Sequence, residues 1–234
     1  MRPITPFQFK QFSISHDKCA HKVGTDGVLL GAWAGVENPK HILDVGSGSG
    51  LIALMLSQRF PNAQVTGIEL DTPSAIQAKE NADNSPFKGR VEIVKGDFLQ
   101  FTFAEKFDLI VSNPPFFKGN TSTGKTERDR ARHEEHLPQA EFLQKAISIL
   151  SKQGMLALIL PREEGSFFKH EAEKQGLHLN RITKVLGSPT APVKRWLVEF
   201  SSNNYVYDQH QITVRDSEGN RSGGYQNLTK DFYL

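Results

Sequence analysis

Residues 43–50, with the sequence LDVGSGSG, decide the fold of this chain. The apolar residues before the glycines predict a buried strand and those after them predict a helix, so the glycines form a strand-to-helix turn. Glycine permits positive φ angles and has no side chain, so a ligand can lie directly on this backbone. The G-x-G-x-G spacing differs from the dinucleotide fingerprint G-x-G-x-x-G, which favours an adenosyl ligand without phosphates. Asp44, Gly46 and Gly48 are therefore candidate cofactor contacts.

Glu69 is the next candidate along the chain. Residues 64–70 predict the second strand, and Glu69 at its carboxyl end lies nineteen residues after Gly50. That separation is close to the spacing of an acid that accepts hydrogen bonds from ribose hydroxyls. The alternative is an acid at a strand end that is simply solvated.

Asp97 follows the third predicted strand, residues 91–94. In an open parallel sheet, ligands bind beyond the carboxyl ends of the strands, so we expect Asp97 at the same edge as Glu69 and the glycines. Its carboxylate could accept from an exocyclic amine, while Leu70 or Phe98 packs on a purine ring.

The fourth predicted strand, residues 107–111, runs into Asn113, Pro114, Pro115 and Phe116. The prolines stiffen the backbone and leave carbonyl oxygens free to accept. The Asn113 amide oxygen and the Pro114 carbonyl can together hold both hydrogens of a planar amino group, while Phe116 stacks on its ring. This arrangement aims the nitrogen lone pair at an electrophile without a strong base. A proline-stiffened loop is the alternative.

The composition indicates a soluble protein with one good core. The chain has 234 residues, 38% of them hydrophobic, and a mean hydropathy of −0.42. No apolar run approaches the roughly 20 residues of a membrane span, and no signal segment opens the chain, so we expect no membrane partner. The single cysteine, Cys19, excludes a disulfide framework and suits the cytoplasm. His16, Cys19 and His21 lack a second ligand pair, so we expect no metal site.

The glycine turn, Glu69, Asp97 and the motif at 113–116 resemble the class I S-adenosylmethionine-dependent methyltransferases that modify exocyclic amino nitrogens. Residues 16–20, 22–33 and 231–234 extend the resemblance to bacterial adenine-N6 methyltransferases of valine tRNA, over nearly the whole chain.

The resemblance implies a Rossmann-like α/β fold, with a seven-stranded, mostly parallel sheet and helices on both faces. It implies S-adenosylmethionine as cofactor and N6 of the adenine at tRNA position 37 as the methyl acceptor. Lys22 and Thr25 are expected to reach the methionine end of the cofactor. Helix capping by Thr25 or Asp26 is the alternative. Phe116 stands where tyrosine is frequent in this family. Guanine N2 in ribosomal RNA and a protein glutamine amide therefore stay open as acceptors.

The basic residues predict where RNA binds. The net charge is only +2, so a local patch must carry the interaction. Residues 176–196 contain basic residues and no acid. We expect RNA contacts from Lys10, Arg132, Lys194 and Arg195, and the alternative is a solvated hairpin. Residues 119–126 fit a phosphate-loop pattern but do not directly follow a strand, so an NTPase is disfavoured.

We expect one methyltransferase domain over residues 1–234. Residues 1–35 form an N-terminal segment and helix, residues 36–201 the catalytic core, and residues 202–234 a tail that docks on the core through Phe232, Tyr233 and Leu234. The favoured oligomeric state is a monomer. A non-catalytic RNA-binding module is a further hypothesis, and the intact motif at 113–116 argues against it.

Overall fold

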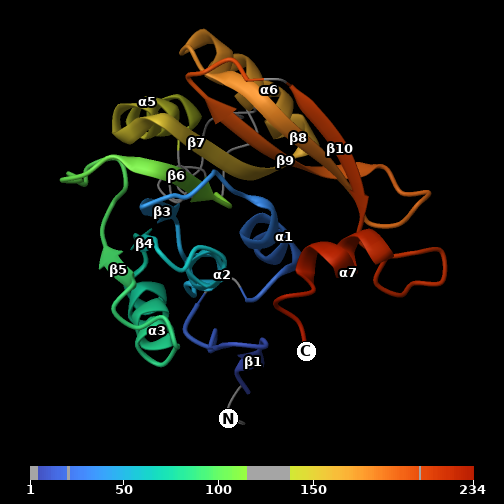
Figure 1. Ribbon diagram of the computed structural model, residues 1–234, viewed down its shortest axis with the longest axis horizontal. Helices are drawn as coiled ribbons and strands as arrows, with labels where there is room; N and C mark the ends of the chain where they lie inside the picture. Colours follow the sequence, from blue (N-terminus) through green and yellow to red (C-terminus); the bar gives the residue numbers. More distant parts are fainter. Residues whose placement is uncertain (1–4, 20–21, 115–137, 206) are drawn as a thin grey trace, which may run out of the picture.

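A mostly parallel sheet forms the centre of the molecule in this computed structural model, which describes residues 5–19, 22–114, 138–205 and 207–234 (Figure 1). Its strands lie in the order β10-β8-β9-β7-β6-β3-β4-β5, and β9 alone among them runs antiparallel to its neighbours. Their bounds are β3 (His41–Val45), β4 (Gln64–Glu69), β5 (Val91–Lys95), β6 (Phe107–Ser112), β7 (Leu150–Pro161), β8 (His178–Leu186), β9 (Val193–Ser201) and β10 (Asp208–Thr213).

Helices cover both faces of the sheet (Figure 1). On one face lie α1 (Thr25–Trp33), α2 (Leu51–Arg59), α3 (Thr72–Asp83) and α7 (Gly223–Thr229), and on the other lie α5 (Gln139–Ile149) and α6 (Arg162–Lys174). A separate hairpin of β1 (Phe7–Gln8) and β2 (Ser13–Ile14) precedes α1. None of the described helices is long and apolar enough to cross a membrane.

Strand alternation explains why the sheet is covered on both faces. In β6, Leu109 and Val111 join the cluster under α1 and α2, while Ile110 between them joins the cluster under α5 and α6. Successive side chains of a strand point to opposite faces, so a nearly continuous apolar strand needs two cores. The predicted α/β class with a mostly parallel sheet is confirmed.

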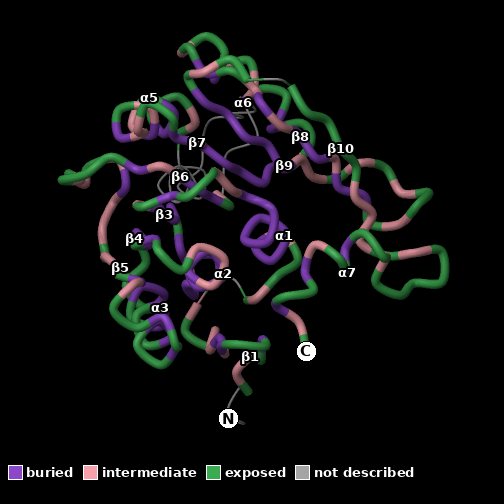
Figure 2. Tube along the Cα trace, viewed as in Figure 1, coloured by how far each residue is buried: buried purple, intermediate pink, exposed green. Residues whose placement is uncertain are grey.

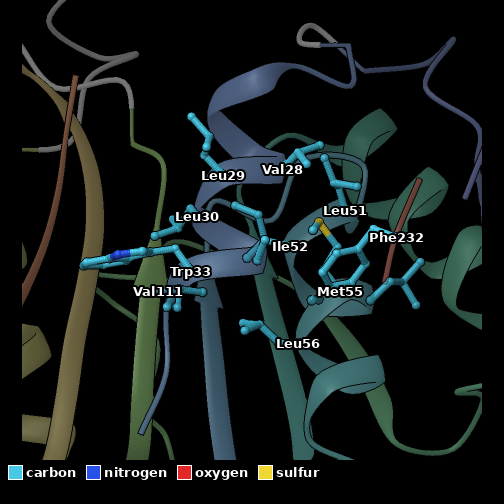
Figure 3. Close-up of a cluster of buried hydrophobic side chains, with 14 of the residues drawn as sticks. Val28, Leu29, Leu30, Trp33, Leu51, Ile52, Met55, Leu56, Val111 and Phe232 are labelled. Atoms are coloured by element: carbon cyan, nitrogen blue, oxygen red, sulfur yellow. The ribbon is translucent and has the colours of Figure 1, made fainter. Parts of the chain in front are cut away.

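Helix α1 is buried over most of its length (Figure 2). It packs on α2, and a Cβ at Gly31 would come within 2.8 Å of the Met55 sulfur, so the close approach of the two helices requires glycine. Phe232 from the end of the chain lies in the same cluster (Figure 3). Phe232 is therefore buried against the body of the molecule.

The C-terminal residues differ from expectation in two ways. Residues 202–234 are not a simple tail, because β10 pairs in parallel with β8 and adds an eighth strand to the seven expected. Leu234 does not dock, since it is 86% exposed. Backbone pairing at a free sheet edge requires little apolar sequence, which is why the polar stretch gave no strand signal.

Candidate active site

The carboxyl ends of three central strands meet at one level. The residue Val45 at the end of β3 pairs with Ile68 of β4 on one side and with Ser112 of β6 on the other. The Ser112 hydroxyl also donates to the Val45 carbonyl at 2.7 Å. Parallel register therefore brings the glycine turn, Glu69 and Asn113 to the same edge of the sheet.

The glycine turn adopts the backbone that its sequence predicts. Gly46, Gly48 and Gly50 have φ angles of 71°, 54° and 80°. A Cβ at Gly46 or Gly48 would meet nothing within 4 Å, so the space over these two residues is open. At Gly50, by contrast, a Cβ would lie 3.3 Å from the Ala78 side chain of α3. The turn thus has one side packed on α3 and an open stretch of bare backbone that fits a ligand.

Glu69 is tied to the turn by its carboxylate. One oxygen accepts from the Gly48 N–H at 2.7 Å, and the other accepts from the Asp71 N–H at 2.9 Å. A carboxylate oxygen has two acceptor positions, so both oxygens keep capacity for ribose hydroxyls. The half-buried side chain is therefore fixed in orientation by backbone donors. A freely solvated acid, the alternative for this residue, does not fit these bonds.

Asp44, in β3 just before the turn, has a carboxyl group with a strongly raised pKa. Its side chain is fully buried, and one oxygen accepts from the Ala53 N–H at 3.0 Å while the other has no hydrogen-bond partner. Burial raises the pKa of Asp44 to about 7, and the negative charge of Glu69 adds to the increase. A buried acceptor without a partner next to open glycine backbone fits a ligand with a positive group or an N–H donor.

The candidate adenine contacts after β4 and β5 differ in how accessible they are. Asp97 is half-buried, and its carboxylate accepts from the Leu99 N–H at 2.9 Å. Leu70 is 58% exposed, whereas Phe98 is 5% exposed and packs against Phe142 with ring centroids 5.3 Å apart. Of the two candidates for packing on a purine, only Leu70 presents its side chain to solvent.

The acceptor motif is described in part. Asn113 is exposed directly after β6, and Pro114 is half-buried beside it. Because both residues directly follow a buried central strand, the backbone that carries the Asn113 side chain is held in place. Pro115 and Phe116 lie outside the described residues, as do Arg132 and residues 119–126.

The start of α1 corrects one interpretation. Thr25 is exposed at the first position of the helix, and Gly24 is the N-cap with no side-chain capping bond. The carboxylate of Asp26 forms an ion pair with Arg195 at 2.8 Å. Capping by Thr25 or Asp26 is therefore wrong. The cofactor contact of Thr25 and of exposed Lys22 stays a prediction.

The expected RNA surface is less positive than the local sequence indicates. Arg195 is paired with Asp26, and Arg181 forms a salt bridge at 2.8 Å with the buried Glu199. Lys194 is exposed at the start of β9. Lys10 lies in the turn after β1, and its ammonium donates to the Lys230 carbonyl at 2.6 Å. A stretch without acids is thus partly neutralised by acids from elsewhere in the chain.

Three residues outside the sequence motifs also shape this region. A Cβ at Gly67 would lie 2.7 Å from Ile93 and 3.0 Å from Ser47, so glycine lets the turn pack on β4. Gln77 and Asn81 are buried polar residues on the inner face of α3. Their four-residue spacing among alanines was the available signal, because it places two amides on one otherwise apolar helix face. Among the described residues, no group of His, Cys, Asp or Glu is arranged to hold a metal ion.

Comparison with known proteins gives consistent results. Residues 26–171 match the family described as Methyltransferase small domain. The chain is 42% identical over 229 residues to the tRNA1(Val) (adenine(37)-N6)-methyltransferase of Bacteroides thetaiotaomicron, covering 97% of each chain. Among solved structures, it is similar to a predicted O-methyltransferase of Agrobacterium tumefaciens, with a TM-score of 0.69 and 19% identity over 88% of this chain and 96% of that chain. It is also similar to a glycopeptide N-methyltransferase complexed with (S)-adenosyl-L-methionine, with a TM-score of 0.56 and 15% identity over 79% of this chain and 90% of that chain. At these identities the two structures show the shared fold alone.

Proposed function

The chain belongs to the methyltransferase small domain family and, within it, to the tRNA1(Val) (adenine(37)-N6)-methyltransferases, and from this premise we propose that it methylates N6 of adenine 37 in valine tRNA with S-adenosylmethionine. The observation that carries the proposal is the level ending of β3, β4 and β6, which places an open glycine turn, a fixed carboxylate and the Asn113 motif at one sheet edge.

The cofactor site is built by the glycine-turn side of this edge. We propose that Glu69 accepts from the two ribose hydroxyls, that Leu70 packs on the adenine ring and that Asp97 accepts from the adenine amine. Gly46 and Gly48 leave the space that the adenosyl group needs, and Asp44 offers its unpartnered oxygen. Lys22 and Thr25 extend toward the methionine end from the segment before β3. S-adenosylmethionine, when bound, supplies a methyl group on a positively charged sulfur.

Asn113 and Pro114 are the proposed acceptor-binding residues. The amide oxygen of Asn113 and the carbonyl of Pro114 each accept one N–H of the target amine, which pulls the nitrogen lone pair out of conjugation and aims it at the methyl group. Phe116 is expected to stack on the extruded base, a contact worth about 1–3 kcal/mol in related sites. Positioning and acceptor contacts therefore replace a general base.

RNA contact is proposed on the neighbouring strands. Lys194 supplies an exposed ammonium at the start of β9, and Arg195 shares its charge with Asp26. Because β9 pairs with the end of β7, with Arg195 opposite Pro161, this pair of cations lies at the same sheet edge as the Asn113 motif. Arg132 and Lys10 remain further candidates. Phosphate contacts of this kind position an RNA without reading its sequence.

Mass spectrometry of nucleosides tests the proposal. Purified protein is incubated with unmodified valine tRNA and S-adenosylmethionine, and the tRNA is digested. The expected product is N6-methyladenosine, and it should vanish when adenine 37 of the transcript is replaced by guanine. Finding N2-methylguanosine instead would refute the proposed acceptor, and finding no methylated nucleoside would refute methylation of valine tRNA.

A further inference from the structure

Residues 15–19 lie along α3 and are held there by Asn81. This side chain is 5% exposed, and its amide oxygen accepts from the Ser15 N–H at 3.0 Å. Its amide nitrogen donates to the Ser15 carbonyl at 2.8 Å and to the Ser49 carbonyl at 2.9 Å. Asn81 thus joins the N-terminal segment to the glycine turn through three hydrogen bonds.

Gln77 holds the same segment one helical turn earlier. It is 1% exposed, and its amide oxygen accepts from the Lys18 N–H at 2.9 Å and from the Cys19 thiol at 3.3 Å. Its amide nitrogen donates to the Asp17 carboxylate at 2.6 Å. Residues four apart share a helix face, so the two amides form one continuous row of contacts.

The row lies at the edge of the proposed cofactor site. Helix α3 begins three residues after Glu69, and the Ser49 carbonyl bound by Asn81 belongs to the glycine turn. Cys19 is close enough to Glu69 and Asp71 for their charges to raise the pKa of its thiol, although burial is the larger cause. Beyond Cys19 the chain leads to Lys22 and Thr25, which are expected at the methionine end.

We propose that Gln77 and Asn81 are positioning residues that clamp residues 15–19 over the cofactor site, so that cofactor affinity depends on two side chains that do not touch the cofactor. The inference rests on the proposed function for the identity of the cofactor. The exposed ion pair between Lys18 and Glu80 is a minor part of the clamp, because exposed pairs are screened and mobile. The buried amides carry it, since losing either leaves backbone or side-chain groups without partners.

Cys19, the only cysteine in the chain, reports on the clamp directly. Its alkylation by iodoacetamide is measured by mass spectrometry, well below the melting temperature, in wild type, Asn81→Ala and Gln77→Ala. We expect alkylation at least about tenfold faster in both variants, because Asn81→Ala loses two hydrogen bonds to the segment and Gln77→Ala loses three. We also expect S-adenosylhomocysteine to slow the alkylation of wild type. Gln77→Ala is the safer variant for folding, because its hydrogen bonds all go to residues 17–19.

Steady-state kinetics separates positioning from a general loss of structure. Both alanine variants should raise the KM for S-adenosylmethionine at least about fivefold and leave kcat within twofold of wild type, since the acceptor motif is untouched. Lys79→Ala is the matched control on the exposed face of α3, and it should change neither value nor the alkylation rate.

Two results would overturn the proposal. Alkylation rates equal to wild type in both variants would show that no clamp holds residues 15–19. Faster alkylation with an unchanged KM would show that the clamp does not serve the cofactor. Failure of the proposed function looks different, because wild type would then fail to bind S-adenosylhomocysteine while the alkylation rates still report the clamp.

Discussion

Two buried carboxylates in different halves of the sheet have opposite surroundings. Asp44, at the end of β3, has a single hydrogen bond to a backbone N–H and one oxygen without a partner. Glu199, in β9, accepts twice from Arg181 and once from the Gly35 N–H, and Arg59 lies close enough to lower its pKa. Burial is the largest influence on the pKa of each carboxyl and raises it in both cases.

The difference indicates that Asp44 belongs to a binding site, whereas Glu199 supports the fold. A buried charge normally persists only where it is paired and hydrogen-bonded, as Glu199 is. Asp44 keeps a cost that folding alone does not explain, and it does so beside open glycine backbone, which indicates a ligand. Five measurements would test this contrast between the glycine-turn half and the β7–β9–β8–β10 half.

The largest effect is expected from the pH dependence of Asp44. Its pKa is raised in the folded state, so its protonated form stabilises the fold at low pH, and that contribution is lost as the pH rises from about 4 through about 7. Between pH 4 and 8, the free energy of unfolding of wild type should fall by up to about 4 kcal/mol relative to Asp44→Asn. Urea denaturation without cofactor measures this difference. If the free energy of unfolding changed equally with pH in the two proteins, the pKa of Asp44 would not be raised in the folded state.

Removing the acceptor amide should reduce chemistry rather than cofactor binding. In Asn113→Ala we expect kcat to fall by about 10²–10³, by analogy with loss of one preorganised group that stabilises a transition state. Calorimetry with S-adenosylhomocysteine should give an affinity close to wild type. Full turnover in Asn113→Ala would refute the proposed mechanism.

Removing the paired carboxylate of Glu199 should lower the stability of the fold and not the activity directly. Glu199→Ala leaves Arg181 and the largely buried Arg59 without their shared acid, and we expect a loss of about 3 kcal/mol in the free energy of unfolding. Asp26→Ala breaks the more exposed pair with Arg195 and should cost less than about 1 kcal/mol. Equal losses would mean that burial does not distinguish the two pairs.

Glu69 gives a smaller effect, on the affinity for the cofactor. Glu69→Ala removes the charge-assisted bonds proposed for the ribose, each worth about 1.5–3 kcal/mol before relaxation, so the affinity for S-adenosylhomocysteine should fall at least about tenfold. Glu92→Ala, at an exposed position of β5, is a control that should bind normally. Unchanged calorimetric affinity in Glu69→Ala would remove this residue from the site.

The smallest effect concerns RNA. Lys194→Ala should lower the salt dependence of tRNA binding by about one unit of slope, because one phosphate contact is lost. Arg195→Ala should change the slope less, since Asp26 already shares its charge. Filter binding over a range of salt concentrations tests both variants. A slope that is unchanged when Lys194 and Arg195 are both replaced by alanine would place the RNA on another face.

Much of the fold followed from local sequence. The glycine turn, the apolar runs of β3, β4, β6 and β7, and the proline at the start of α3 each specify their own backbone, because φ preferences and side-chain periodicity act over a few residues. The same motifs predicted the methyltransferase family, which the relatives confirm. The polar strand β10 had no such signal, since its pairing with β8 depends on backbone groups rather than on apolar side chains.

Local motifs set the order of the site's parts along the chain: glycines, Glu69, Asp97 and Asn113. Which charges are free, by contrast, depends on how the chain packs. Arg195 meets an acid 169 residues away, and Gln77 and Asn81 hold residues about sixty positions earlier. The physical reason is that backbone preferences are local, whereas electrostatic compensation and burial depend on distances in space that only the packed sheet and helices define.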